Sequence, residues 1–489
     1  MDTGTSTGTV VDPLEVIVAP NAPSFLATAR GKLVLLVLCG VAFLDFIDGS
    51  IVNVALPDIR ADLNFSVQGL QWVPSGYLLT YGGFMLFGGR LADLLGRRRI
   101  LLTGTVIVGV ASMLGGFAGD AGVLVAARMA QGLGAAFMLP AALSILTTTF
   151  TVATDRHKAL GVWGGVAGLA SAIGVFLGGI LTEGPGWRWV MFVNPIACAL
   201  VIPAVLRLIE PTRARTRAGG FDVVGTVLAT GGMLLLVFAL VKAPEQGWSA
   251  ASTVAELIGA FVILALFVVN ESLHRSPLMP LSIFRVRGLV AADVTQLIAF
   301  AGFLAVFFFL TLYMQNVLGY SPLQTGAAYL PLCAGVAVSA GVGAQLVSRI
   351  GTRPLIIIGS LIAAGGVYYL SRIPVDGSYL ADILPGTLIM SAGLGPAFVA
   401  VATAANAGVS ADRAGLAAAL LNASQQVGGA LGLAIFSAIS TARAQDLLHN
   451  GTPVANALTS GFRHALFAGA VFLVAAAISG LRTTTTKEA

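Results

Sequence analysis

The hydrophobic residues of this chain are gathered in long runs that are separated by short polar segments. Crossing the hydrocarbon core as a helix takes about 20 apolar residues, and fourteen of these runs reach that length. We therefore predict an all-α membrane protein with 14 transmembrane helices. The predicted spans begin near Leu33, Gln68, Ile100, Gly122, Ala159, Trp189, Val223, Ser252, Leu289, Thr325, Pro354, Ile383, Ala414 and His464.

The composition excludes a water-soluble fold. Charged residues make up only 10% of the 489 residues, hydrophobic residues make up 57%, and the mean hydropathy is +0.91. Because soluble domains carry about 25% charged residues, this chain lacks the side chains for a hydrated surface, and the lipid bilayer is its expected partner. The net charge is +5, but the basic residues are scattered over short loops rather than gathered in one patch, so they do not indicate nucleic-acid binding.

The distribution of basic residues predicts the orientation. If the N-terminus is cytoplasmic, the inward loops and tails hold 20 of the 27 Lys and Arg residues, and Arg128 lies within a span. The outward loops hold six, namely Arg60, Arg188, Lys242, Arg372, Arg443 and Arg463. Cytoplasmic loops of membrane proteins are enriched in Lys and Arg. We therefore predict a multi-pass protein of the cell membrane with both termini in the cytoplasm.

An internal repeat divides the chain into two halves. The segment GRLADLLGRR at 89–98 recurs in weakened form as AQLVSRIGTR at 344–353, each time after the second span of a six-span unit. Parallel six-span repeats are typical of transporters that rock around a central site. The predicted parts are a disordered tail at 1–30, an N-terminal half at 31–210, two inserted helices at 221–272, a C-terminal half at 288–482 and a second tail at 483–489.

Two carboxylates lie within the first span, Asp45 and Asp48, in the segment LDFIDGSIVNVALP. Ionisable residues inside a membrane are costly and are usually functional. A spacing of three residues places both on one helix face, and two close carboxylates in a low dielectric do not readily ionise together. We predict that this pair binds and releases a proton. The alternative is that one carboxylate lies near the outer rim and is merely hydrated.

The fourth span carries Arg128 and Gln131 one turn apart. An arginine stays charged inside the membrane and requires a carboxylate partner. We predict that Arg128, together with Gln131, takes part in proton coupling, and the alternative is a structural ion pair that fixes the positions of the helices.

The loop after the second span combines one acid with several arginines. We predict that Gly89, Arg90, Asp93, Gly96, Arg97 and Arg98 form a latch that pairs with neighbouring helix ends in one conformation and releases them in another. The alternative is that these arginines serve only the positive-inside topology.

Two further groups of residues carry weaker signals. Gly168, Gly174, Gly178 and Gly179 in the fifth span permit close helix packing. Asn422, Gln425 and Gln426 in the thirteenth span either join helices or line a pore. The chain has no GxxxxGK[ST] loop and no soluble domain for ATP, so we expect no enzyme activity, no metal and no cofactor. The expected energy source is an ion gradient, such as a proton gradient, or the gradient of the substrate itself.

These segments together resemble the major facilitator superfamily, and specifically its fourteen-span drug:proton antiporter branch. IDGSIVNVALP at 47–57 resembles the first-span signature of that branch, which places the acidic residue of the family on Asp48 and leaves Asp45 as an extra. QWVPSGYLLTYG at 71–82 and YLPLCAGVAVSA at 329–340 are similar to two more of its stretches. GRLADLLGRRR and ARMAQGLGAA resemble the loop and fourth-span motifs, which implies a proton-transfer role for Arg128.

The chain departs from this family pattern at three positions. Val175 stands where the antiporter motif GxxxGPxxGG has proline, Leu94 replaces a frequent arginine, and Gln425 occupies a place that is often arginine. The first departure weakens the assignment of antiport over symport.

The resemblance implies proton-coupled export of drugs, antibiotics or similar lipophilic small molecules, and acidic residues in the spans suit cationic ones. The mechanism we expect is competition, in which Asp48, helped by Asp45, binds either a proton or substrate. Three alternatives stay open: a proton-coupled uptake symporter, an exporter of one self-made metabolite, and a membrane sensor without transport.

Overall fold

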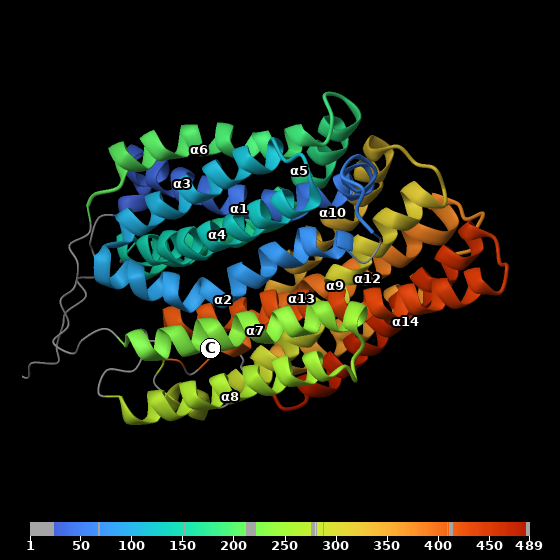
Figure 1. The fold of residues 1–489 in the computed structure, drawn as a ribbon. Coiled ribbons are helices and arrows are strands. Elements are labelled where there is room, and N and C mark those ends of the chain that lie inside the picture. The colour runs from blue at the N-terminus through green and yellow to red at the C-terminus, as the bar shows by residue number, and fades with distance from the viewer. Residues whose placement is uncertain are drawn as a thin grey trace, which may run out of the picture.

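The computed structural model describes residues 24–66, 69–150, 152–211, 222–274, 279, 281–286, 288–407, 409 and 414–485. Within these residues the chain forms fourteen α-helices and no strand (Figure 1). The α-helices are α1 Ala29–Asp62, α2 Trp72–Leu95, α3 Arg97–Gly116, α4 Ala121–Thr149, α5 Ala153–Glu183, α6 Arg188–Leu208, α7 Val223–Gln246, α8 Ala251–Leu273, α9 Leu289–Asn316, α10 Pro322–Ile350, α11 Thr352–Leu370, α12 Leu384–Asn406, α13 Ala414–His449 and α14 Val454–Gly480. Four shorter helical segments are η1 Phe25–Ala27, η2 Gly69–Gln71, η3 Leu281–Arg285 and η4 Tyr379–Ile383.

The described helices have the length and composition of membrane spans. Twelve of them, searched over the described residues alone, are long and apolar enough to cross a bilayer, and α2 and α5 are the two others. Large apolar side chains such as Leu200 on α6 and Phe261 on α8 point outward, where lipid covers them. The predicted class, an all-helical membrane protein, is confirmed.

Two helices begin six or more residues before the apolar spans predicted for them. Helix α5 begins at Ala153 rather than near Ala159, and α14 begins at Val454 rather than near His464. The early segment of α5 is mostly polar, and in that of α14 polar residues interrupt the apolar ones. Hydropathy marks where lipid begins, not where the helical hydrogen bonds begin. For the same reason Arg60, Arg443 and Arg463, predicted in outward loops, lie inside helices.

The predicted N-terminal tail is only partly described. Residues 24–30 form η1 and the start of α1, so the disorder predicted as far as residue 30 extends too far. Residues 1–23 and 486–489 lie outside the described part of the chain.

The last six helices pack on one another in the same way as the first six, with each helix number raised by eight. In the first six, α2 and α3 pack on α4, α1 packs on α5, and α3 packs on α6. In the last six, α10 and α11 pack on α12, α9 packs on α13, and α11 packs on α14. We call these groups the N-terminal half, α1–α6, and the C-terminal half, α9–α14.

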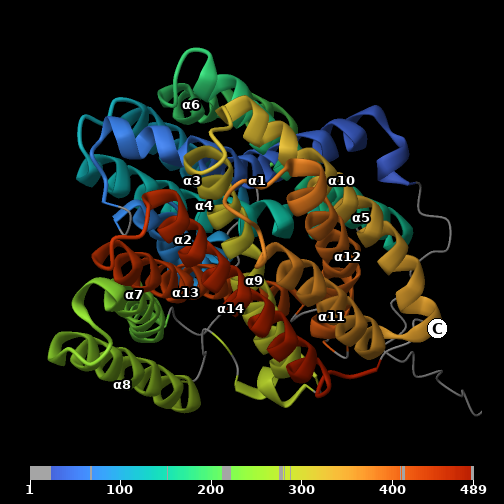
Figure 2. The ribbon, with the colours of Figure 1, turned by 90° about the vertical axis from the view of Figure 1, so that its right-hand side faces the viewer.

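Helices α7 and α8 form a hairpin beside the two halves (Figures 1 and 2). Helix α7 packs on α2 of one half and α13 of the other, which also contact each other. The inserted pair therefore covers one seam between the halves, whereas α5 and α10 form a second seam.

Glycine ends the second helix of each half at the same point of the repeat. Gly96 joins α2 to α3 with φ 99°, and Gly351 joins α10 to α11 with φ 87°. Residues with a Cβ rarely adopt these angles, so both turns require glycine. The face at which α2 meets α3 is also the face at which α1 begins and α14 ends (Figure 1). We call it the terminal face and the other end of the bundle the opposite face.

Close backbone approach holds α3 against α4. A Cβ added at Gly134 would lie 2.8 Å from the carbonyl oxygen of Gly104, and one added at Gly104 would lie 2.6 Å from that of Gly134. The two helices therefore meet backbone to backbone, as small residues allow in membranes.

We predict that Gly134→Ala destabilises the protein by about 1–3 kcal/mol, the usual range for overpacking, because rigid backbone leaves the methyl group no space. Thermal unfolding of the purified protein in detergent measures this as a lower midpoint. The matched control is Gly40→Ala on α1, where no atom lies within 4 Å of the added Cβ. Equal midpoints for the two variants would contradict the packing described here.

Candidate functional site

A buried ion pair joins α1 to α4 in the N-terminal half. The Nη1 atom of Arg128 lies 2.7 Å from Oδ2 of Asp48, and the two side chains are only 1% and 3% exposed. The Nε atom of Arg128 donates a further hydrogen bond of 3.2 Å to the carbonyl oxygen of Val73 on α2. The predicted partnership of Arg128 with a carboxylate is therefore present in the structure.

Two amides complete the surroundings of the Asp48 carboxylate. The Nε2 atom of Gln131 donates to Oδ1 of Asp48 at 3.2 Å and to the hydroxyl of Ser112 on α3 at 2.5 Å. The Oε1 atom of Gln131 accepts from Nη1 of Arg128 at 2.9 Å, and Nδ2 of Asn194 on α6 also donates to Asp48. Hydrogen bonds to the charged form stabilise a carboxylate. The hydrogen bonds around Asp48 thus tie α1, α3, α4 and α6 together.

Asp45 lies one turn away but has different partners. It is 5% exposed, and it accepts hydrogen bonds from the Tyr77 hydroxyl at 3.1 Å and the Tyr81 hydroxyl at 2.9 Å. The two tyrosines stand one turn apart on α2, with ring centroids 5.4 Å apart. Across the described residues, Asp45 forms no ion pair. This buried carboxylate therefore lacks the cation that its neighbour has.

Tyr77 connects the two carboxylates. Its hydroxyl binds Asp45, and the guanidinium of Arg128 lies over its ring, 4.5 Å from the centroid. An aromatic face attracts a cation, so the position of the ring affects the guanidinium above it. The side chain of Tyr77 therefore links the hydrogen bonding of Asp45 to the Arg128–Asp48 ion pair.

The predicted latch residues contact neighbouring helix ends within the N-terminal half. Nη1 of Arg97 donates to the hydroxyl of Thr148 on α4 at 2.8 Å, and Nη2 of Arg98 donates to the carbonyl oxygen of Leu206 on α6 at 2.7 Å. Gly89 and Arg90 lie half-buried on α2, and the side chain of Asp93 is outside the described part. That these contacts are released in another conformation stays a prediction.

The glycines of α5 pack against both neighbouring helices. Gly174 and Gly178 lie against Ser50 and Ile51 of α1, and Gly179 lies against the carbonyl oxygen of Pro322 at the start of α10. Each would place a Cβ within 3 Å of these atoms. The surroundings of Gly168 are not among those described. These glycines thus let α5 approach α1 of its own half and α10 of the other half.

The three polar residues of α13 have different surroundings. Nδ2 of Asn422 donates to the carbonyl oxygen of Ala418 in its own helix, at 3.0 Å. Gln426 lies at the seam between the halves, next to Gly82 of α2, and Gln425 is half-buried. A pore-lining role for these residues stays a prediction.

Hydrogen bonds join the two halves near the opposite face. Oε2 of Glu183, at the end of α5, accepts from the hydroxyl of Ser321 at 2.6 Å and from the backbone N–H of Leu323 at 3.1 Å. Nε2 of Gln315 on α9 donates to the carbonyl oxygen of Val54 on α1 at 2.8 Å. These contacts hold the halves together at this face, and sequence analysis missed them.

Sequence analysis also missed four residues around the carboxylates. They are Tyr77, Tyr81, Ser112 and Asn194. Asn194 and Ser112 were detectable by the criterion that selected Gln131, because each is a polar residue inside an apolar run. The tyrosines carry no such signal, since tyrosine is common in apolar spans.

Comparisons with known proteins identify the family. A family model described as Major Facilitator Superfamily matches residues 38–433. The chain belongs to this superfamily. The membership predicted from the motifs is confirmed, and the protein is a multi-pass membrane transporter rather than an enzyme.

The similar curated proteins are named for antibiotic resistance and export. The chain is 39% identical to the puromycin resistance protein pur8 of Streptomyces alboniger, over 90% of this chain and 88% of that protein. It is 37% identical to the cephamycin export protein CmcT of Amycolatopsis lactamdurans, over 92% of each chain. It is 34% identical to the tetracenomycin C resistance and export protein of Streptomyces glaucescens, over 91% and 80%.

Solved structures agree with the fold. A bacterial homolog of the human lysosomal transporter Spinster, in an inward-facing and unoccupied conformation, superimposes with a TM-score of 0.65 at 20% identity, over 93% of this chain and 97% of that one. A D-xylose-proton symporter gives a TM-score of 0.62 at 14% identity, over 91% and 97%. At these identities the likeness shows the fold alone.

We predict that Asp48→Asn destabilises the protein by about 3–5 kcal/mol, because it leaves the Arg128 guanidinium buried without a countercharge. The double variant Asp48→Asn/Arg128→Gln removes both charges and recovers much of that loss. Thermal unfolding of the four proteins in a double-mutant cycle measures the coupling. Additive effects of the two substitutions would show that the pair contributes nothing to stability.

Proposed function

We propose that this transporter exports drug-like small molecules across the cell membrane in exchange for protons. The names of three relatives that span most of the chain support export of antibiotics. Further support comes from the buried, ion-pair-free carboxylate of Asp45, which is the single observation that carries the proposal. The protons, and the lipophilic and cationic character of the substrate, are part of this proposal.

The topology we propose has all fourteen helices crossing the bilayer, with the terminal face in the cytoplasm. Fourteen helices of alternating direction bring both ends of the chain to one face. The excess of 20 over six basic residues supports a cytoplasmic position for that face.

The two carboxylates of α1 have different roles in this proposal. Asp48 is already neutralised by Arg128, so a proton or a cation gains little by binding there. A bare charge at Asp45 costs several kcal/mol inside a membrane, because no described cation offsets it. A proton or a cationic substrate removes that cost, and the two compete for one site. The motif had suggested Asp48 as the exchanging residue, whereas the contacts favour Asp45.

Tyr77 transmits the state of Asp45 to the helix packing. A protonated Asp45 is a weaker acceptor than a carboxylate, so the Tyr77 hydroxyl is held less firmly. The ring beneath Arg128 then gains freedom, and the ion pair between α1 and α4 is weakened. Proton binding thereby biases the packing of the N-terminal half, which is what a shift between two conformations requires.

We predict that Asp45→Asn lowers proton-driven efflux at least tenfold, on the order expected for loss of an essential proton-binding group. The amount of protein in the membrane stays the same, because the amide oxygen still accepts a hydrogen bond from one tyrosine hydroxyl and the amide NH2 group donates to the other. Ethidium efflux from an efflux-deficient host, with and without a protonophore, measures the rate. The controls are the wild-type protein expressed at an equal level and Tyr81→Phe, which removes one hydrogen bond to Asp45 but keeps the carboxylate. If the Asp45→Asn variant exports ethidium at the wild-type rate, the proposed coupling mechanism is wrong.

The direction of transport separates export from uptake. Expression of an exporter lowers the ethidium or puromycin content of the cells and raises the inhibitory puromycin concentration, whereas expression of an uptake symporter does the reverse. A second candidate is dedicated export of one antibiotic-like compound, since the three relatives are each named for one antibiotic. A panel of chemically unrelated drugs distinguishes the two, because a dedicated exporter protects against one class.

The carboxylate of Glu183 closes the opposite face in this proposal. It belongs to α5, but it caps the start of α10 in the other half. Opening towards the outside separates these helices and breaks both hydrogen bonds. Because charged hydrogen bonds are about twice as strong as neutral ones, the carboxylate favours the closed state.

We predict that Glu183→Gln shifts the protein towards an outward-open state, because the amide is a weaker cap. Spin labels on cysteines at Gly119 and Asn316, which are exposed and lie in different halves, then report a larger population of long distances. Asp62→Asn is the matched control, since Asp62 pairs with Arg188 at the same face but within one half. Identical distance distributions for both variants would exclude a gating role.

A further inference from the structure

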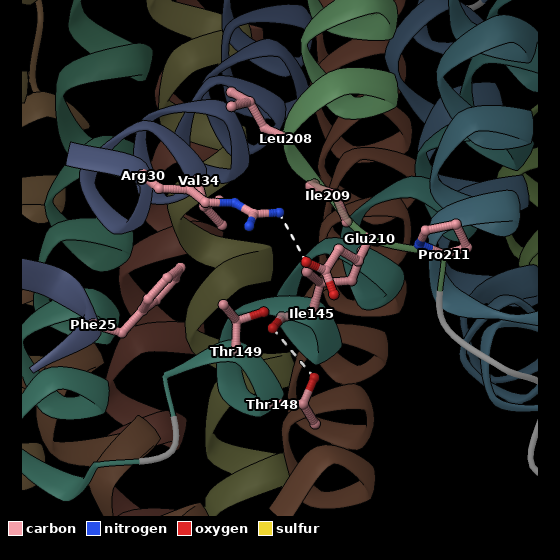
Figure 3. Close-up of a pocket in the computed structure, with 10 residues that line it drawn as sticks. All are labelled: Phe25, Arg30, Val34, Ile145, Thr148, Thr149, Leu208, Ile209, Glu210 and Pro211. Carbon is pink, nitrogen blue, oxygen red and sulfur yellow. Dashed lines mark hydrogen bonds and ion pairs between the residues drawn. The ribbon is translucent and has the colours of Figure 1, made fainter. Parts of the chain in front are cut away.

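A cavity of about 540 Å³ lies at the terminal face of the N-terminal half, apart from the buried carboxylates (Figure 3). It is an open cavity lined by η1, the start of α1, the end of α4, and the end of α6 with the residues that follow it. Small-molecule sites usually have volumes of about 300–1,000 Å³, so this cavity has room for a ligand. The proposed transport mechanism makes no use of it.

An exposed ion pair spans the cavity. Nη2 of Arg30 lies 2.8 Å from Oε1 of Glu210, and the two side chains are 55% and 78% exposed (Figure 3). Exposed pairs of this kind contribute little net stability. A ligand that carries both a negative and a positive group can therefore separate the two side chains and satisfy each of them.

The floor of the cavity is polar and lies beside further positive charge. Thr148 and Thr149 line it from the last turn of α4. The hydroxyl of Thr148 accepts a hydrogen bond from Arg97, and Arg98 holds the end of α6. The guanidinium that lines the cavity is that of Arg30, and a phosphate is the anion that suits it, because guanidinium groups match phosphate oxygens well.

The walls of the cavity are apolar and firmly held. Phe25, Val34, Ile145 and Leu208 are among the residues that line it. The η1 segment that carries Phe25 is anchored by Asp155 of α5, which accepts a hydrogen bond of 2.7 Å from the Ser24 hydroxyl. Ligands with hydrocarbon next to the charged groups therefore fit better than a bare ion.

We propose that this cavity binds the headgroup of a phospholipid with a primary amine, the phosphoethanolamine group. The phosphate contacts Arg30 and Thr149, the ammonium contacts Glu210, and the glycerol end lies on the apolar wall. The cavity lies at the ends of membrane-spanning helices, which is the level of lipid headgroups. Such a lipid joins η1, α1, α4 and α6 next to the Arg97 and Arg98 contacts.

Lipid retention by the purified full-length chain tests the proposal. The protein is equilibrated in mixed micelles with equal amounts of dioleoyl phosphatidylethanolamine, phosphatidylcholine and phosphatidylglycerol, and the bound lipids are counted by native mass spectrometry. The ethanolamine lipid is expected to be retained about tenfold over the choline lipid, which offers no N–H donor to Glu210. Equal retention of the three lipids overturns the proposal.

Single substitutions assign the two ends of the headgroup. Arg30→Gln lowers retention of the ethanolamine lipid to the level of the choline lipid. Glu210→Gln keeps the phosphate contact but abolishes the preference for ethanolamine over glycerol. Arg99→Gln, which removes an exposed charge from the same face outside the cavity, is the matched control and leaves retention unchanged. If Arg30→Gln behaves like Arg99→Gln, the site is not the one proposed.

A soluble competitor separates a lipid from a free metabolite. Glycerophosphoethanolamine carries the same charged groups without acyl chains, so it should not displace the lipid at equal concentration. Displacement at equal concentration would overturn the assignment to a lipid. Because all of these readouts are binding measurements, their outcome is independent of whether the protein transports drugs.

Discussion

The buried ion pair between Asp48 and Arg128 is the interaction on which the rest of this structure depends. It joins α1 to α4, and through Gln131, Ser112 and Asn194 it also holds α3 and α6. Loss of either partner leaves an uncompensated charge in an apolar interior, which is among the most destabilising changes known in proteins. The pair is thus a fixed charge around which the N-terminal half is organised.

A fixed pair gives its neighbour a distinct role. Asp45 lies one turn away, and in the described structure it is bound by two tyrosine hydroxyls rather than a cation. The difference between the two carboxylates arises from their partners and not from their depth, since both are almost fully buried. One of them is neutralised by the protein itself, and in the proposed mechanism the other binds a proton or a substrate. Gly179 on α5 and Gly82 on α2 lie at the two seams, where they bring helices of the two halves close together.

The sequence predicted the helices well where apolar residues run without interruption. At α5 and α14 the helices begin before the continuous apolar runs, because polar residues occur in the early segments of both and hydropathy marks lipid rather than helix. The pairing of Arg128 with a carboxylate followed from the cost of a lone charge in a membrane. Which of the two carboxylates it binds did not follow, because their spacing places both on one face.

The remaining site residues depend on contacts that no local pattern records. Tyr77 and Tyr81 come from α2, and Asn194 comes from α6, more than a hundred residues from the carboxylate it binds. Glu183 and Ser321 lie 138 residues apart in the chain and meet where helices of the two halves pack together. Such pairings are set by how whole helices pack, and the sequence alone gives the residue types but not their partners.

Proton release upon substrate binding is the measurement that tests the central claim most directly. Purified protein in weakly buffered detergent solution is mixed with ethidium, and the change in solution pH is followed with an indicator dye. The account predicts that the wild-type protein releases protons as ethidium binds and that Asp45→Asn binds ethidium without releasing them. Undiminished proton release by the Asp45→Asn protein would contradict it, because the exchanging proton would then belong to another group.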